Sequence, residues 1–565
     1  MSLPVLLRLL PSGLLLVSLS AVAQEDPLAR ALHDEMQRSM QQLQLEQLGK
    51  PYFISYLVTD DEVTAASATL GSVLSSTQNR TRMLWVSVRV GDYGLDSSNF
   101  VPLQGGALLA SAPTRLPLDD DYQELRRQIW LATDRSYKAA LENLAGKRAA
   151  LENRNRTGSV ADFTRVAPAV VSDLEPPADL DLESATRRVR EASALFRQAP
   201  AITGSSLRLV QVNRLRRYLN SEGSQHTVRV PSLALTIAAA TEASDGRLLS
   251  DELTVFGRAA RDLPSAANLS LRVRSLEEEL EQLRSAPLAE RYEGPVLFEG
   301  EAAGELFGRF AAQLAATPRS VTSNGPYAML APQATGSLVD KIGWRVLPEF
   351  LDVVDDPTLT EAEGGSLLGG YKVDEEGVVA RRTLLVHQGI LKTLLTSRAP
   401  VEGVPETSAN LRGRGVVPSN VLVSSQKSST REELRQQMLQ LAQSQGAGYA
   451  LVIRRLHGNI ATLVYKLYPD GHEELVRNAT LTDFNLSSFK SIVAVSRETA
   501  VYTLPLPARA TQGNVFFMAS LTAGAETPLV SCVIPSLLFA DVAIEKPPVD
   551  SPKPMLLSSP LAAGP

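Results

Sequence analysis

Length is the property that most constrains the fold of this chain. It has 565 residues, of which 44% are hydrophobic. A single hydrophobic core stops growing near about 250 to 300 residues, so two domains are expected. The single cysteine, Cys532, excludes an intramolecular disulfide. Burial of apolar surface therefore has to supply the stability of the fold.

The first 23 residues have the pattern of a cleavable secretion signal. One cation, Arg8, precedes the apolar stretch 12–23, and the small residues Ala21 and Ala23 favour cleavage after Ala23. A membrane anchor is the alternative, but the run is shorter than the roughly 18 apolar residues of a crossing, and Pro11 interrupts it. No later segment reaches that length. The sequence predicts an exported protein, periplasmic or secreted, that does not associate with the membrane after signal cleavage.

The charge of the chain argues against a nucleic-acid partner. The formal net charge is −6, and acidic and basic residues are mixed along the sequence. Binding to phosphates requires clustered lysines and arginines, and no basic block occurs.

Residues 24–293 have the alternation of helical and strand patterns that is typical of an α+β domain. The expected helices cover residues 28–43, a segment that starts after the acidic run 119–121, and residues 183–198. The expected strands are 52–59, 63–75, 83–90, 207–212, 217–219 and 227–230, with a turn at 221–223. Residues 157–181 are interpreted as a surface connection. A charged, solvated connecting helix at 269–288 ends the domain, and the boundary is placed at Gly294.

Residues 294–546 are rich in hairpin signals. Gly377, Gly389 and the turn 469–471 separate short apolar runs. One helix interrupts them, because Thr430 and Glu433 have the spacing of a capping box. The Pro-rich tail 547–565 is expected to be disordered. The second half is therefore expected to be a β-rich domain.

Common catalytic motifs are absent from the sequence. No two histidines have the spacing of a helical zinc site, and the string at His472 lacks the second histidine of a zincin. Neither a nucleophile elbow nor a phosphate-binding glycine loop occurs. Cys532 lies in an apolar run and is interpreted as a buried hydrophobic residue rather than a nucleophile.

One segment, 294–307, combines a short strand with the start of a helix. Ala303, Leu306 and Phe307 begin the buried stripe of this helix. Glu301 and Glu305 lie on its opposite face, where Glu305 can pair with the Arg four residues later. The two carboxylates are either part of a solvated face or a cluster that faces a cleft.

This segment also belongs to a set of motifs that resembles a known family. The strings are EGPVLFEGEAAGELF at 293–307, VDEEG at 373–377, VHQGILK at 386–392 and Arg398, followed by YPDG at 468–471 and PSLL at 535–538. They resemble the C-terminal domain of the TldD/PmbA family, whose members are metalloproteases and their metal-free partner subunits. The resemblance covers nearly all of the second half and implies a barrel-like, β-rich domain there. The first half fits less distinctively, through NSEG at 220–223.

The resemblance also implies roles for individual residues. In the zinc-bearing branch, a helix carries H-E-x-x-x-H, in which two histidines bind the metal and the glutamate is the general base. At the matching positions here, Glu301 keeps the acid–base position, while Gly300 and Glu305 replace the two histidines. Cys532 lies too close to Pro535 to match the family's cysteine ligand. The chain therefore resembles the PmbA-like branch, a pseudoenzyme in which zinc is expected only in a partner subunit.

Three functions remain open on this basis. The first is a non-zinc subunit that forms a dimer with itself or with a zinc-bearing TldD-like paralogue, and that helps to enclose a chamber for unfolded peptides. The second is an active hydrolase with an unrecognised carboxylate site at Glu299, Glu301 and Glu305. The third is a non-enzymatic protein that binds peptides or acts as a scaffold.

Overall fold

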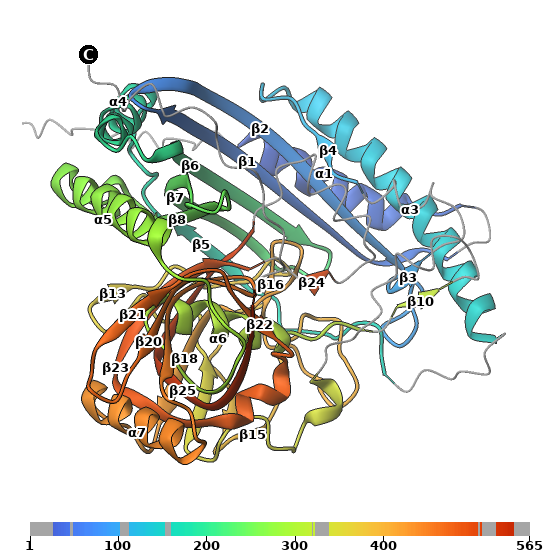
Figure 1. Cartoon of the computed structure of the whole chain (residues 1–565). Coiled ribbons are helices and arrows are strands. Elements are labelled where there is room, and N and C mark those ends of the chain that lie inside the picture. Colours follow the sequence, from blue (N-terminus) through green and yellow to red (C-terminus); the bar gives the residue numbers. More distant parts are fainter. Residues whose placement is uncertain are drawn as a thin grey trace, which may run out of the picture.

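The computed structural model describes residues 26–45, 49–101, 112–152, 160–318, 320–322, 338–506, 509–510 and 527–546. The predicted signal 1–23 and the predicted disordered tail 547–565 lie outside the described residues. Figure 1 shows two large β-structures, one from each half of the chain, with the long strands of the first half above the strongly curved sheet of the second half. Among the described residues, no helix is long and apolar enough to cross a membrane.

The first half forms a seven-stranded sheet in the order β4-β2-β1-β6-β7-β5, with β8 paired to β7. The strands are β1 (Pro51–Thr69), β2 (Ser72–Val90), β4 (Thr114–Arg115), β5 (Val170–Leu174), β6 (Ile202–Asn220), β7 (Gln225–Glu242) and β8 (Leu248–Gly257). All pairings are antiparallel except that of β5 with β7. The predicted turn at 221–223 joins β6 to β7.

The expected strands 207–212 and 217–219 are parts of one strand, β6, and two further predictions in this half are wrong. The expected strand 63–75 contains the turn between β1 and β2, where Leu70 and Gly71 have φ angles of 47° and 74°. Gly71 supplies this left-handed conformation readily, and the small residues around it give no apolar alternation that would mark the strand ends. The expected connection 157–181 contains β5, whose residues alternate between exposed and half-buried positions and so lack a buried apolar stripe.

Among the described residues, four helices pack against this first sheet. They are α1 (Pro27–Gln42), α3 (Tyr122–Glu152), α4 (Leu182–Ser193), which continues into the 3-10 helix η1 (Ala194–Gln198), and α5 (Ala266–Ser285). Helices α1 and α3 share a core with β1 and β2, and α4 and α5 share another with β6, β7 and β8. Helix α5 is where the connecting helix was predicted, but it is not solvated on all sides, because Leu269, Val273, Leu276, Leu280 and Leu283 are buried.

The second half forms an eleven-stranded sheet that closes on itself. The ring consists of β9 (Tyr292–Phe298), β19 (Ala450–His457), β20 (Ile460–Leu467), β22 (Ala479–Thr482) and β25 (Leu529–Glu545), and β25 pairs again with β9. The other strands of this sheet are β11 (Leu351–Asp355), β14 (Thr383–His387), β15 (Ile390–Leu391), β18 (Asn420–Ser425), β21 (Glu473–Val476) and β23 (Ile492–Pro505). The predicted β-rich, barrel-like domain is confirmed.

Two helices and several short elements complete the second half. Helix α6 (Glu301–Gln313) packs against β19, β23 and β25, and its predicted buried stripe is confirmed. Helix α7 (Arg431–Ser444) has the predicted capping box between Thr430 and Glu433. The remaining short strands and 3-10 helices in the described part of the chain are β3 (Phe100–Val101), β10 (Val321–Thr322), β12 (Glu361–Ala362), β13 (Gly365–Ser366), β16 (Leu411–Arg412), β17 (Gly415–Val416), β24 (Arg509–Ala510), η2 (Ala260–Asp262), η4 (Val339–Lys341) and η5 (Leu486–Ser491).

Candidate functional site

The candidate segment of the sequence is the junction between β9 and α6. The strand ends at Phe298 and the helix begins at Glu301, with Gly300 as the N-cap residue. Gly300 has a φ of 56°, a backbone conformation that L-residues rarely adopt. A histidine at this position would therefore be strained, although there is open space around it.

Glu301 is bound by an arginine that joins the two halves of the protein. Its carboxylate accepts a hydrogen bond from Nε of Arg455 in β19, at 3.1 Å. The same guanidinium donates to Asp251 of β8 and to Glu279 of α5, each at 2.6 Å. Asp251 is 5% exposed and also contacts Nε2 of His457 at 2.8 Å. The family's general-base position is thus part of an ion-pair network between the two sheets.

The other two carboxylates of the junction also have arginine partners. Burial acts to raise the pKa of Glu299, but the hydrogen bonds and charges of Arg431 and Arg454 outweigh it and hold that pKa below its usual range. Glu305 lies 3.9 Å from Arg309, which is the predicted pair. A general acid needs a raised pKa, so the lowered pKa of Glu299 does not suit that role.

Two glycines allow α6 to lie close to β23. A Cβ atom at Gly304 would lie 2.2 Å from Cγ of Tyr502, and one at Gly308 would lie 2.5 Å from Cδ1 of Leu504. Both separations are far below van der Waals contact. The position four residues after the N-cap is therefore restricted to glycine by packing.

Gly304→Ala is expected to lower the free energy of unfolding by about 1 to 3 kcal/mol, because the added methyl group overpacks the contact with Tyr502. The better helix propensity of alanine, about 1 kcal/mol, acts in the opposite direction and only reduces this loss. Urea unfolding followed by circular dichroism measures it. Gly448→Ala is the control, since a Cβ there meets nothing within 4 Å. Equal unfolding midpoints for the two variants would contradict the close packing.

The residues at the junction do not fit a zinc ion. No group of three or more His, Cys, Asp or Glu side chains in the described part of the chain is arranged to hold a metal. His387 and His472 each contact a single aspartate, Asp352 and Asp470. Burial, followed by the charges of two acidic groups, raises the pKa of Cys532 to about 12, so its thiolate form is disfavoured.

His226, which stacks on Tyr218 with ring centroids 5.0 Å apart, gives a pH dependence of defined sign. Burial, and then the charge of Arg216, lower the pKa of His226 from 6.5 to about 3. The unfolded chain takes up a proton near pH 6.5 and the folded protein does not, so stability falls as the pH drops from 6.5 towards 3. His226→Phe should keep the stacking but lose this titration. Its melting temperature is expected to fall less steeply below pH 6.5 than that of the unaltered protein, and parallel curves would contradict the assignment.

The VDEEG segment lies at the contact between the two halves. Asp374 is buried and accepts backbone N–H groups of Glu376, Val378 and Leu411, and burial raises its pKa well above the usual range. Glu375 accepts the N–H groups of residues 413 and 414 and lies 3.7 Å from Arg216 of β6. The carboxylates of Asp374 and Glu375 therefore hold the backbone of neighbouring loops in place by accepting hydrogen bonds.

Arg398, another residue of the resemblance, is fully buried at the same contact. Its guanidinium donates to the carbonyl of Thr164 at 2.7 and 3.0 Å and to Glu222 at 3.0 Å, both in the first half. It also lies over the rings of Phe53 and Phe163, at 5.2 and 4.0 Å from their centroids. The motif residues that mark the second half thus hold it against the first half.

A large cleft of about 930 Å³ lies between the two halves. Its walls come from β1, β2, β6, β7 and β8 on one side and from residues 368–374, 411–412 and 527–529 on the other. It is rich in guanidinium groups, from Arg115, Arg208, Arg214, Arg216, Arg258 and Arg412, and its described lining includes the carboxylates of Asp61 and Asp374. Glu299, Glu301 and Glu305 are not among the described residues that line it. Sequence reasoning missed this cleft, because its residues come from segments far apart in the chain.

Comparison with known proteins agrees with this fold. Residues 290–546 match the PmbA/TldA metallopeptidase C-terminal domain. A metalloprotease of Methanocaldococcus jannaschii is 42% identical over 76 residues, which are 14% of this chain and 15% of that protein. A metalloprotease of Methanothermobacter thermautotrophicus is 26% identical over 258 residues, which are 44% of this chain and 52% of that protein. The chain thus matches about half or less of the length of these relatives.

The structural comparison extends over both halves. The crystal structure of TldE from Thermococcus kodakarensis superimposes with a TM-score of 0.57 and 12% identity, over 91% of this chain and all of that one. At this identity the likeness concerns the fold. The second half of the chain, residues 290–546, is therefore a C-terminal domain of the TldD/PmbA family, and the chain as a whole shares the fold of TldE.

Proposed function

We propose that this protein is the metal-free subunit of a TldD/PmbA-type peptidase assembly, in which a zinc-bearing relative carries out the cleavage. The observation that carries the proposal is the state of the β9–α6 junction. Gly300 has no side chain to bind a metal, and Glu301 is bound to Arg455 rather than directed at a metal-bound water. An activated water on zinc needs three protein ligands, and the described residues do not supply them.

The cleft between the two halves is the proposed binding site for peptide. Its volume of about 930 Å³ lies at the upper end of the range for ligand pockets and suits a short stretch of polypeptide. Among its described lining residues, arginines outnumber carboxylates, so we expect peptides with acidic side chains to bind better than basic ones. The partner would be a second copy of this chain or a zinc-bearing TldD-like relative, in a two-fold or pseudo-two-fold dimer.

An active hydrolase that uses Glu299, Glu301 and Glu305 has less support. Each of the three carboxylates has an arginine within ion-pair distance. The arginines beside Glu299 hold its pKa below the usual range, so this carboxyl group is a poor proton donor at neutral pH. Cleavage of unfolded peptide by the purified chain alone would nevertheless restore this alternative.

The test mixes the mature protein with the TldD-type protein of the same genome and measures three quantities. Light scattering should show a complex, metal analysis should find zinc only in the relative, and cleavage of unfolded peptides should require the relative. Near-equimolar zinc in this chain alone would contradict the proposal. A monomer in both samples at micromolar concentration would instead favour a solitary binding protein or scaffold.

The role of the cleft has a separate test. Arg208→Glu reverses an exposed charge in the cleft, and Arg345→Glu, outside it, is the matched control. Fluorescence anisotropy with an acidic, unfolded peptide should show weaker binding for Arg208→Glu only. Equal affinities would place the peptide elsewhere.

We also propose that the protein is exported and that its mature chain begins at Gln24. The support is the signal pattern of residues 1–23. Mass spectrometry of the protein from the periplasm or the medium measures the N-terminus. Retention of Met1 with the protein in the cytoplasm would contradict export.

A further inference from the structure

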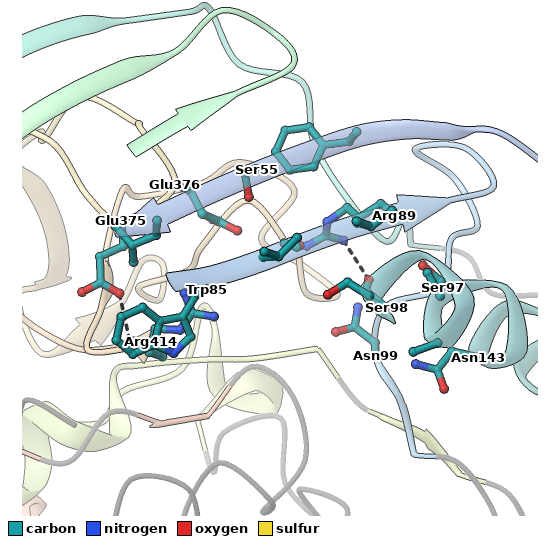
Figure 2. Close-up of a pocket in the computed structure, with 18 of the residues that line it drawn as sticks. Ser55, Trp85, Arg89, Ser97, Ser98, Asn99, Asn143, Glu375, Glu376 and Arg414 are labelled. Carbon is teal, nitrogen blue, oxygen red and sulfur yellow. Dashed lines mark hydrogen bonds between the residues drawn. The ribbon is translucent and has the colours of Figure 1, made fainter. Parts of the chain in front are cut away.

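A second, smaller pocket of about 130 Å³ lies on the face of β1 and β2, and no residue of the β9–α6 junction is among its described lining residues. Figure 2 shows residues of both halves around it, with Ser55 on β1, Arg89 on β2, Asn143 on α3, and Glu375 and Glu376 from the second half. The lining also includes the apolar side chains of Phe53, Leu57, Trp85, Val88 and Phe100. The pocket thus has polar groups and an apolar wall.

Two buried hydrogen-bond donors in this lining have no partner among the described residues. They are Nε of Arg89 and Nδ2 of Asn99, and the two residues are 7% and 5% exposed. Oδ1 of Asn143 is a third atom for which the described part of the chain provides no partner. A buried polar atom without a partner costs about 1 to 3 kcal/mol, so groups of this kind are normally satisfied by water or by a ligand. Two donors in one pocket indicate an occupant that accepts hydrogen bonds.

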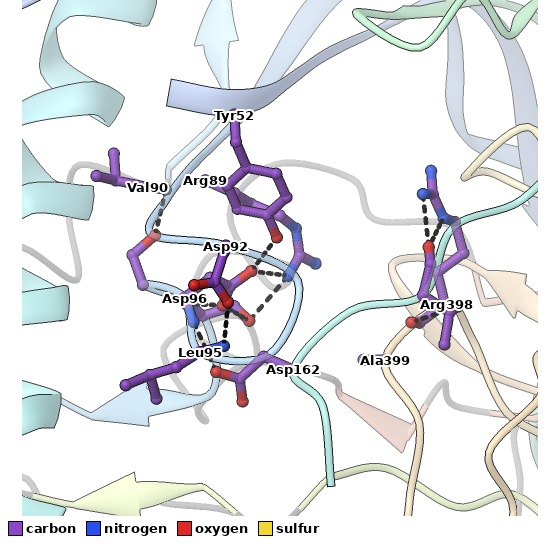
Figure 3. Close-up of polar contacts among 12 residues, drawn as sticks. Tyr52, Arg89, Val90, Asp92, Leu95, Asp96, Asp162, Arg398 and Ala399 are labelled. Atoms are coloured by element: carbon purple, nitrogen blue, oxygen red, sulfur yellow. Dashed lines mark hydrogen bonds and ion pairs between the residues drawn. The ribbon is translucent and has the colours of Figure 1, made fainter. Parts of the chain in front are cut away.

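Arg89 is held in place by contacts with neighbouring side chains. One of its terminal nitrogens donates to Ser98 (Figure 2) and to Asp96 (Figure 3), each at 2.8 Å, and Tyr52 donates to the same aspartate at 2.7 Å. Its guanidinium also stacks on the ring of Phe163, at 3.7 Å from the centroid. The direction of Nε is therefore fixed before any ligand arrives, which lowers the entropy lost on binding.

Glu376 supplies an acceptor to the same pocket. One of its carboxylate oxygens accepts the backbone N–H of Arg398 at 2.8 Å, and the other has no hydrogen bond to a described residue. Glu376 and Arg89 both line this pocket, as Figure 2 shows. The pocket therefore offers donors for an anion and a carboxylate for a cation within one small space.

Zwitterionic α-amino acids carry that combination of groups at that size. We propose that this pocket binds a free α-amino acid, with its carboxylate on Arg89 and Asn99, its ammonium group on Glu376 and its side chain against Phe53, Trp85 and Val88. Ordered water alone is the competing occupant, since one water needs only about 10 to 15 Å³ of such space. This inference does not depend on the proposed function of the cleft or of the β9–α6 junction.

Isothermal titration calorimetry of the full mature protein tests the proposal, with glycine, alanine, leucine, aspartate and lysine as probes. Two leucine analogues distinguish the ends of the ligand: 4-methylpentanoate lacks the ammonium group and isoamylamine lacks the carboxylate. At least one amino acid should bind, and both analogues of leucine should bind about tenfold or more weakly than leucine itself. The highest ligand concentration is about 10 mM, which is sufficient to detect dissociation constants in the millimolar range. If none of the five amino acids gives a heat of binding at this concentration, water fills the pocket and the proposal is overturned.

Two variants keep the test specific to this pocket. Asn99→Gly removes a donor and suits the φ of 55° at this position, and Glu376→Gln removes the charge but can still accept the Arg398 N–H. Each should weaken binding about tenfold or more. The control is Asn478→Gly, another asparagine with positive φ, 59°, that does not line the pocket, and it should leave the affinity unchanged. Unchanged binding by both pocket variants would place the amino acid at another site and refute the assignment.

Discussion

Arg455→Met is expected to lower the free energy of unfolding by about 3 to 5 kcal/mol, the usual loss when one partner of a buried ion pair is removed. Arg455 compensates three carboxylates, at 2.6 Å from Asp251, 2.6 Å from Glu279 and 3.1 Å from Glu301. Methionine fills similar space but leaves Asp251, whose side chain is 2% exposed, with His457 as its other ion-pair partner among the described residues. Desolvation of an uncompensated carboxylate then destabilises the folded state.

Chemical unfolding followed by circular dichroism measures the change, with Arg345→Met as control. The pair of Arg345 with Glu349 is exposed and 3.8 Å long, so its loss is expected to change stability by less than about 1 kcal/mol. The double variant Arg455→Met, Asp251→Asn should recover part of the loss. A change for Arg455→Met as small as that of the control would show that the network contributes little.

Arg398→Ala is expected to lower stability by a similar amount, about 3 to 5 kcal/mol, and to weaken the contact between the two halves. The fully buried guanidinium binds the carbonyl of Thr164 and the carboxylate of Glu222, and alanine leaves both without this donor. It also leaves a cavity between the rings of Phe53 and Phe163.

Differential scanning calorimetry can separate these two effects. If Arg398 couples the halves, the variant should unfold in two transitions that lie further apart than in the unaltered protein. Arg382→Ala is the control, because that side chain is 61% exposed and its pair with Asp356 is 3.8 Å long. Identical calorimetric profiles for the two variants would contradict the coupling role.

Local signals in the sequence predicted the short-range structure well. The capping box at Thr430 and Glu433, the buried stripe of α6 and the turn at 221–223 depend on residues within a few positions of one another. The structural class of each half was also predictable. Helical and strand patterns alternate in the first half, and hairpin signals dominate the second half. The exposed edge strand β5 was missed because its residues carry no buried apolar stripe.

The partners of the candidate residues could not be predicted in the same way. The position of Glu301 at a strand-to-helix junction follows from its neighbours, but Arg455 is 154 residues further along the chain. Asp251 precedes Glu301 by 50 residues, and both carboxylates reach Arg455 only because the two sheets are in contact. One local signal was present, since Arg454 and Arg455 interrupt the apolar run of β19 and such charges need partners. The same limit applies to Arg89 and Glu376, which come from different halves.

The closed ring of strands sets an order of events during folding. Its last member, β25, pairs with β9, β18, β22 and β23, and β9 precedes it by more than two hundred residues. The ring cannot close until nearly the whole chain has left the ribosome, and contacts so distant in sequence form slowly. Until then β9 and β22 have unpaired edges that can join strands of other chains. A nascent protein of this design therefore depends on chaperones more than its finished stability would indicate, and deletions that remove β25 should aggregate rather than fold to a shortened barrel.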